Sequence, residues 1–398
     1  MFYFILFFIL ILFALNDIFI KKSIRTSSYS LLIIVFVLVA VAGLRWETGV
    51  DWHAYTIWFD KTPIIGSANF FDIFKSLDIG FLLLISLIKT FGGNIQTIFF
   101  IMSIISFSFL YKALKMYTPY RNISIFLYFC LVFFVLDMSG IRQAVSLNIF
   151  FFSIRYIKDK NIKKYLIYIL IAISFHWTAI LFIPFYFFLN KRFSTIKCFI
   201  FTSICLLIAI FKINWISFFI NFIIKYFTKG LFISKIIIYS TNNIFAVSKR
   251  FGFGGIAICL IFIFICIFRK KMEKRFPFFN IFFNLFLFYI FIFFGLFMFA
   301  EISSRLRFYT FLSIIILLPY FLFFIKTLES KTIYLFLMIF YGFLYVKPYL
   351  LSEEQAIAFT PYQNYIIHKV IFDKTSNGYE RMMRHNEIYI ETMKNNDY

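Results

Sequence analysis

The chain lacks the short motifs that mark several large enzyme classes. It contains no glycine-rich nucleotide-binding loop, no zinc-ligand spacing and no Gly-x-Ser-x-Gly elbow. These absences exclude enzymes built on those motifs, and we expect neither a metal ion nor a cofactor. An enzyme of this sequence would draw its energy from an activated, membrane-bound donor.

Cysteine and acidic residues are also scarce. The five cysteines all lie inside apolar runs, which excludes a disulfide framework and indicates small buried hydrophobic residues. Residues 1–15 lack both a basic start and a small-residue cleavage site, so they predict a retained first span rather than a signal peptide.

Apolar residues dominate what is present. They make up 62% of the 398 residues, with a mean hydropathy of +0.89, and they occur in long blocks such as residues 256–268 and 285–300. Crossing a bilayer takes roughly 20 mostly apolar residues. The sequence predicts an all-α polytopic membrane protein with roughly 10–12 transmembrane helices. We expect a membrane domain over residues 1–350 and a polar tail over 351–398.

The net charge of +22 comes from 40 Lys and Arg against 18 Asp and Glu. The basic residues are spread over short loops rather than gathered in one patch. This is the positive-inside pattern, which sets orientation and argues against nucleic acid as a partner. The loops at 21–25 and 155–164 are predicted to be cytoplasmic, which places the N-terminus and residues 45–78 outside.

Three segments do not fit regular alternation. Residues 79–91 are too short to span, and we expect them to lie in the outer leaflet. Residues 165–189 have basic residues at both ends, which predicts a helix pair broken near His176 with an aqueous cavity at the break. Residues 214–251 carry lysines without acids and predict an amphipathic helix on the bilayer surface.

Polar clusters occur where apolar helices begin, end or break, and this topology places them towards one side. The sequence around them reads GLRWETGVDWHAY at 43–55, DMSGIRQ at 137–143, FHW at 175–177, EISSRLR at 301–307 and TPYQN at 360–364. Charged residues at such positions are costly and indicate function. Because the arginine fork matches phosphate oxygens, several arginines on one face favour a diphosphate ligand.

Roles follow from residue chemistry. Gly140 before a helix would add backbone donors beside Arg142, and Asp51 could serve as a general base. Each cluster also has an ordinary alternative. Aromatic residues form interfacial belts, His176 could be a satisfied polar residue, Asp137 a helix cap, and the arginines of 301–307 could extend to the interface.

The same clusters resemble a known family. Arg45…Thr48-Gly49-x-Asp51…Tyr55, Ile141-Arg142-Gln143, Phe175-His176-Trp177, Arg305-x-Arg307-Phe308-Tyr309 and Pro361-Tyr362 are similar, in order and approximate spacing, to the EpsG family of polysaccharide polymerases. That family is related to the Wzy-type O-antigen polymerases. The first motif is the most specific of the five, and the tail beyond Asn364 carries none.

The resemblance implies a membrane glycosyltransferase of the bacterial inner membrane with its site facing the periplasm. The growing glycan would move from undecaprenyl diphosphate to the next lipid-linked oligosaccharide unit, in the synthesis of O-antigen, capsule or exopolysaccharide. Membrane lipid, a chain-length regulator and a flippase of the same pathway are the implied partners. We assign Asp51, Arg142 and His176 to catalysis, and to substrate binding Arg45, Tyr55, Gln143, Arg305, Arg307 and Tyr362.

Two other functions fit part of the pattern. A flippase or transporter of the lipid-linked unit is the main alternative, although it should carry charges at mid-membrane and open to both faces. A non-catalytic scaffold of an export complex would have little use for so many costly polar residues.

Overall fold

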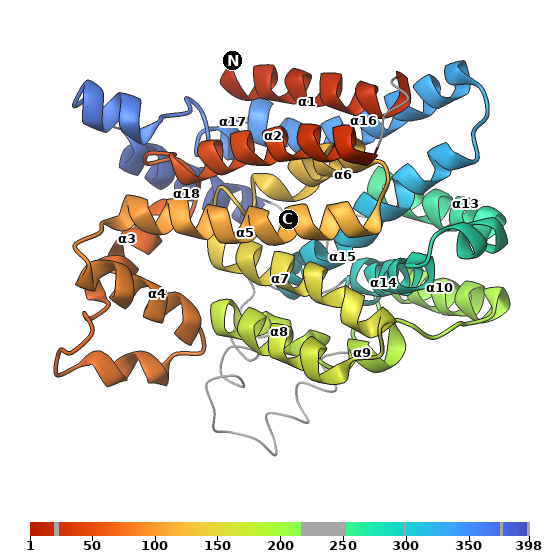
Figure 1. Cartoon of the computed structure of the whole chain (residues 1–398), viewed down its shortest axis with the longest axis horizontal. Coiled ribbons are helices and arrows are strands. Elements are labelled where there is room, and N and C mark those ends of the chain that lie inside the picture. Colours follow the sequence, from red (N-terminus) through yellow and green to blue (C-terminus); the bar gives the residue numbers. More distant parts are fainter. Residues whose placement is uncertain (20–23, 216–251, 298–299, 375–376, 396–398) are drawn as a thin grey trace. The chain divides into compact units, whose positions relative to one another are not determined.

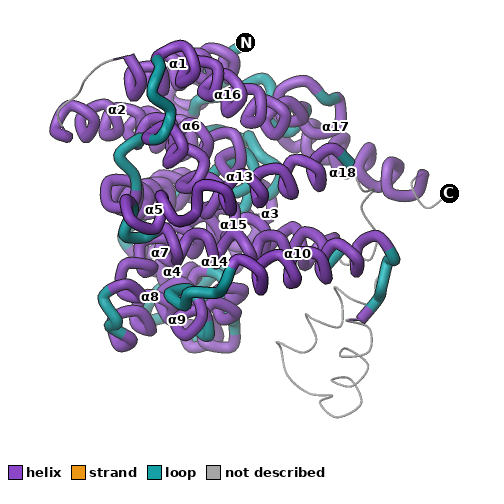
Figure 2. The backbone as a smooth tube through the Cα atoms, turned by 90° about the vertical axis from the view of Figure 1, so that its right-hand side faces the viewer, coloured by secondary structure: helices purple, strands orange, loops and turns teal. Residues whose placement is uncertain are grey.

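The computed structural model describes residues 1–19, 24–215, 252–297, 300–374 and 377–395 (Figure 1). The structure is 78% helical and contains no strand within these residues (Figure 2). Extended backbone pairing in the described part is limited to an isolated bridge between Arg45 and Asn364. The predicted all-α class is confirmed.

Four helical stretches in the described residues are long and apolar enough to cross a membrane. They are α1 (Phe2–Phe19), α5 (Ile95–Tyr117), Ser303–Phe323 and α16 (Leu328–Leu351). Several shorter apolar helices accompany them. The chain is therefore a polytopic membrane protein, while the predicted total of 10–12 spans stays a prediction.

The chain divides into two compact units. The first comprises Met1–Ile183 and Leu318–Asn396, and the second comprises Pro184–Leu317. This division follows packing, whereas the predicted boundary at residue 350 separates apolar from polar sequence and stays a prediction. The predicted surface helix at 214–251 lies almost entirely outside the described residues.

The first unit is a stack of helices. Helices α2, α5, α7 and α8 pack in succession, and α1 packs on α6 and α16 (Figures 1 and 2). The remaining bounds are α2 Ile24–Gly43, α3 Trp52–Lys61, η1 Phe70–Lys75, α4 Ile79–Thr90, α6 Arg121–Tyr128, η2 Phe129–Phe133, α7 Ile141–Lys158, α8 Ile162–Phe175, η3 Trp177–Phe182, η5 Phe321–Phe323, α17 Glu353–Ala356, η6 Ile366–Ile371 and α18 Gly378–Asn395.

A buried polar network ties α5, α6 and α7 together. The Asp137 carboxylate accepts hydrogen bonds from the Ser106 hydroxyl and the Tyr128 hydroxyl, each at 2.8 Å. The Asn148 amide donates to both hydroxyls, also at 2.8 Å. Buried polar groups are tolerated when they are paired in this way. Asp137 therefore joins helices, and the cap position of α7 belongs to Gly140.

The predicted break near His176 is present. Helix α8 ends at Phe175, His176 takes an extended conformation, and the 3₁₀ helix η3 follows. The predicted short helix at 79–91 is α4, Ile79–Thr90. Helix α4 packs on α8, and a side chain at Gly80 would overlap Ser174. This close approach sets the start of α4 beside the break at His176.

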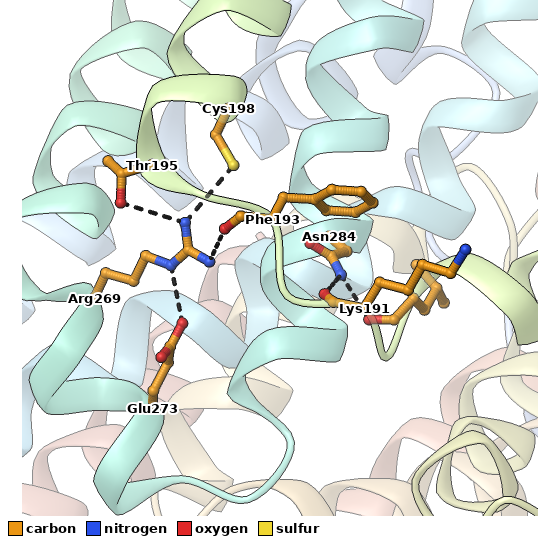
Figure 3. Close-up of polar contacts among 8 residues, drawn as sticks. Lys191, Phe193, Thr195, Cys198, Arg269, Glu273 and Asn284 are labelled. Atoms are coloured by element: carbon orange, nitrogen blue, oxygen red, sulfur yellow. Dashed lines mark hydrogen bonds and ion pairs between the residues drawn. The ribbon is translucent and has the colours of Figure 1, made fainter.

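The second unit contains α9 (Phe185–Phe188), α10 (Thr195–Ile210), α13 (Phe253–Arg275), α14 (Phe279–Ile290), η4 (Phe291–Gly295) and most of α15 (Ala300–Tyr320). Figure 3 shows its polar contacts around Arg269 and around Asn284. Arg269 donates to the Glu273 carboxylate at 2.9 Å and to the Phe193 carbonyl at 2.6 Å. The Asn284 amide donates to the Leu189 carbonyl at 2.8 Å. These bonds fix the segment that leads into α10.

Candidate functional site

Arg45 follows the end of α2 and is fully buried. Its Nη1 donates to the carbonyls of Ala42 at 2.5 Å and Asp137 at 3.2 Å, and its Nε donates to Thr48 at 3.1 Å. The guanidinium also lies 4.4 Å from the centre of the Phe99 ring, a favourable cation–π distance. Burial lowers the pKa of Arg45 to about 10, so it keeps its charge at neutral pH. These contacts set the start of the loop that carries Asp51.

The middle of this loop requires a glycine. Gly49 has φ +104°, and a side chain there would overlap the carbonyl oxygen of Met138. Only glycine adopts that conformation without strain. The next residue, Val50, donates its N–H to the Ser139 hydroxyl at 3.1 Å. The loop is thereby seated on the turn that leads into α7.

Residues 358–365, which include the TPYQN sequence at 360–364, form backbone hydrogen bonds with the same loop. Trp46 donates its N–H to the Gln363 carbonyl at 2.8 Å, and Tyr365 donates to the Leu44 carbonyl at 2.7 Å. Gly49 donates to Ala358 at 2.8 Å in the same way. Segments about 320 residues apart in the chain therefore form one structural element.

Tyr362 belongs to this element. Its hydroxyl donates to the Val41 carbonyl at 3.1 Å, and its ring stacks on Phe2 with centroids 4.3 Å apart. Burial raises the pKa of Tyr362 to about 12. The contacts of Arg45 and Tyr362 described here are with protein groups, and the predicted substrate-binding roles of both residues stay predictions.

An ion pair lies beyond the other end of the loop. Arg142, in the first turn of α7, places Nη1 2.6 Å from the carboxylate of Asp78. The guanidinium carbon lies 4.1 Å from the ring centre of Trp58 and 5.8 Å from that of Tyr55. The Asp78 side chain is 3% exposed, whereas that of Arg142 is 21% exposed. Arginine carries five N–H donors. Asp78 accepts from Nη1 and Nε is buried, so a ligand would have to be bound through the terminal amino groups.

Asp51 and Tyr55 lie at the start of α3, whose Tyr55 ring is close to this ion pair. Asp51 is the residue before α3, and its half-buried side chain does not cap that helix. Tyr55, one turn later, is buried against Phe81. Burial raises the pKa of Tyr55; the charge of Arg142 opposes this shift, and that of Asp51 adds to it. Asp51 and Tyr55 lie one helical turn apart at the start of α3, and the Arg142 guanidinium carbon lies 5.8 Å from the Tyr55 ring centre.

His176 reaches the same neighbourhood through its chain neighbour. The Trp177 N–H donates to the second oxygen of Asp78 at 3.3 Å. The His176 ring is buried, its Nδ1 lies 2.7 Å from the Thr178 hydroxyl, and it stacks beside Trp177. The carboxylate of Asp78 thus links α4, α7 and the break after α8.

Sequence reasoning missed Asp78. The available signal was its position: Asp78 directly precedes an apolar helix, as Asp51 precedes α3. Its partners are 64 and 99 residues away, so only the fold identifies them. Gln143, next to Arg142, is buried.

Arg305 and Arg307 belong to α15 in the second unit. The guanidinium carbon of Arg307 lies 5.5 Å from the Phe311 ring centre. Their predicted approach to Arg142 stays a prediction. The described residues include no cluster of His, Cys, Asp and Glu that could hold a metal ion.

The cluster formed by Asp51, Tyr55, Asp78 and Arg142 has a definite chemical capacity. An arginine held by one carboxylate and stacked on an indole can bind a second anion through its remaining donors. A nearby half-buried carboxylate can accept a proton from a bound hydroxyl. We refer to these four residues as the Arg142 site.

The fold and this site define an all-α polytopic membrane protein with charged residues gathered at helix ends. Residues 28–364 match the model of the EpsG family. The chain belongs to the EpsG family, a family of Wzy-like polysaccharide polymerases and glycosyltransferases. The resemblance stated from the motifs is therefore confirmed. No curated protein and no solved structure matches the chain.

Proposed function

We propose that this protein polymerises lipid-linked oligosaccharide units at the periplasmic face of the bacterial inner membrane. The growing glycan is transferred from undecaprenyl diphosphate to the next undecaprenyl-diphosphate-linked unit. The observation that carries the proposal is the Arg142 site: a partly exposed arginine, paired to one carboxylate, beside a second carboxylate. Family membership supports the reaction class.

The proposed chemistry is a displacement at the anomeric carbon of the donor sugar. The acceptor hydroxyl oxygen forms the new glycosidic bond, and the bond between the anomeric carbon and the diphosphate breaks. Asp51 takes the hydroxyl proton, and the diphosphate leaves with its electron pair. Arg142 stabilises the negative charge that develops on the leaving group, with Arg305 and Arg307 as further candidate donors.

Asp78 acts indirectly in this scheme. Asp78 holds Arg142 on one oxygen and the Trp177 N–H on the other. The break at His176 is thereby fixed relative to the arginine. We assign His176 to positioning the sugar or the diphosphate, with Gln143 beside Arg142.

The test is an assay with purified protein in lipid vesicles and a synthetic undecaprenyl-diphosphate repeat unit as sole substrate. We expect a ladder of lengthening products that Asp51→Asn and Arg142→Ala each reduce by about 100-fold or more. Asp60→Asn, which changes an exposed carboxylate on the same helix α3, is the matched control and should leave the ladder unchanged.

The same vesicles distinguish the alternative. Movement of the repeat unit across the sealed bilayer without a ladder would assign the protein as a flippase. A ladder that survives both substitutions would remove the Arg142 site from the mechanism.

A further inference from the structure

The C-terminal helix α18 lies beyond the segment that matches the family. The match ends at residue 364, whereas α18 covers Gly378–Asn395. Motif comparison therefore assigns nothing to this helix. In the structure its first turns contact the loop formed by residues 45–51, which we call the motif loop.

Arg381 makes the main contact. Its Nη2 donates to the Glu47 carbonyl at 3.0 Å, and its Nη1 donates to the Pro361 carbonyl at 3.0 Å. Nη2 also lies 3.4 Å from the side-chain oxygen of Gln363. Arg381 is only 7% exposed, and burial lowers its pKa. A buried charge is retained only where hydrogen bonds compensate its desolvation, so this is a specific contact.

Two neighbouring residues of α18 extend the contact. The Gly378 N–H donates to the Glu47 carboxylate at 3.2 Å, and a side chain at Gly378 would overlap Glu47. The Tyr379 ring packs edge-on against His53, with centroids 4.9 Å apart. Helix α18 thus contacts the Glu47 carbonyl and the Glu47 carboxylate of the motif loop, and it contacts His53, two residues after the loop ends.

The contacts of α18 hold Glu47 in an unfavourable backbone conformation. Glu47 has φ +42°, in the left-handed region that non-glycine residues rarely occupy. Such a conformation is unfavourable for a residue with a side chain and persists only where the surrounding structure holds it. The Glu47 carbonyl is bound by Arg381 and its carboxylate by Gly378. Asp51 follows four residues later. The backbone conformation of Glu47 therefore determines the direction in which the chain enters the Arg142 site.

We propose that α18 is part of the site and that Arg381 is its positioning residue. Arg381 acts through Glu47 and the motif loop, and it does not touch the reacting groups. The effect on reaction rate rests on the proposed polymerase function, whereas the effect on the motif loop does not.

The first experiment reads the loop directly. Thr48 is fully buried in the motif loop, so a Thr48→Cys chain should react slowly with a membrane-impermeant maleimide. Adding Arg381→Ala should increase the labelling rate about 10-fold or more, because the loop then samples open conformations. Arg384→Ala alters an exposed arginine of the same helix and is the matched control. The chain without Thr48→Cys measures labelling of the native cysteines.

Arg381→Lys keeps the charge but has a single donor group. This conservative variant keeps the test informative if Arg381→Ala fails to fold. We expect a labelling rate between those of the parent and Arg381→Ala. Equal labelling of Thr48→Cys in all three backgrounds would overturn the proposal.

The second experiment separates positioning from folding in the vesicle assay. Arg381→Ala should lower kcat by about 10- to 100-fold with little change in KM, and Arg381→Lys should restore part of it. A loss that only follows the amount of folded protein would reduce Arg381 to a structural role. If the parent itself makes no ladder, the proposed function fails, and the labelling result still decides whether α18 holds the motif loop.

Discussion

Each unit of the protein contains an arginine paired with a carboxylate, and the two arginines differ in how much of the side chain stays exposed. Arg269 in the second unit binds Glu273, the Phe193 carbonyl, the Thr195 hydroxyl at 3.5 Å and the Cys198 sulfur at 3.7 Å. Its side chain is 8% exposed. Its donors are thus directed at protein acceptors.

Arg142 in the first unit has a different environment. Its ion pair with Asp78 uses Nη1, aromatic rings cover one face, and 21% of its side chain stays exposed. Arg269 pairs with a residue one helical turn away, whereas Asp78 lies 64 residues from Arg142. A saturated local pair holds a loop in place. An unsaturated pair between distant helix ends offers a charge to a ligand, and this contrast leads us to place the chemistry at Arg142.

The largest effect on stability is expected at the saturated pair. Arg269→Ala leaves Glu273 and the Phe193 carbonyl without their donor, and breaking a buried pair costs about 3–5 kcal/mol. The free energy of unfolding, measured by denaturant titration in micelles, should fall by about 3 kcal/mol. Lys270→Ala, at the exposed neighbouring position, is the control and should change it little. An unchanged value for Arg269→Ala would show that this pair is not what holds the segment before α10.

The next effect concerns activity. Arg142→Lys keeps the charge but loses the planar fork and its stacking on Trp58, so we expect polymerisation to fall about 100-fold. Its free energy of unfolding should change less than that of Arg269→Ala. Product formation per folded protein measures the first quantity. If Arg142→Lys lowered the free energy of unfolding as much as Arg269→Ala and left product formation per folded protein unchanged, Arg142 would have a structural role.

A smaller effect should follow from neutralising each carboxylate. Asp78→Asn keeps an acceptor for the Trp177 N–H but removes the charge opposite Arg142, and we expect kcat/KM to fall about 10-fold. Glu273→Gln is the same change in the second unit and should leave kcat/KM near that of the parent. Steady-state kinetics in vesicles compare the two. Equal losses would mean that both pairs act only on folding.

The smallest effect is expected at an exposed pair. The Lys369 Nζ lies 2.5 Å from a carboxylate oxygen of Asp373, and this hydrogen bond lowers the pKa of the carboxylate. Any stability from this shift is present above the unfolded-state pKa and is lost as pH falls through the lower folded-state value. Solvent screens such a pair, so Asp373→Asn should unfold like the parent near neutral pH and at about pH 3. A pH-dependent difference between the two would show that exposure alone does not predict which pairs matter.

Much of the fold could be predicted because it depends on local composition. Apolar runs gave the helices, and basic residues at both ends of 165–189 gave the break at His176, which the structure contains. The motifs also predicted catalytic roles for Asp51, Arg142 and His176. Asp78 links Arg142 to the backbone of Trp177, next to His176, while the catalytic roles of all three residues stay predictions.

What the sequence could not provide were the partners of each charged group. Arg45 has the same sequence context as a ligand-binding arginine at a helix end, yet it is buried on backbone carbonyls, one of them 92 residues away. Arg381 has no motif around it and contacts Glu47, 334 residues earlier. Both arrangements depend on which distant segments meet, which local periodicity does not encode.

The closure of the motif loop by the end of the chain bears on how the protein is made. The ribosome synthesises α1 to α16 before residues 358–365 and α18. The four candidate membrane-spanning helices of the described residues all belong to this earlier part. A nascent chain can therefore insert its helices while the loop at 45–51 lacks the partners of Trp46, Glu47 and Gly49. The order of synthesis makes residues 358–365 and α18 the last of the described parts of the site to appear.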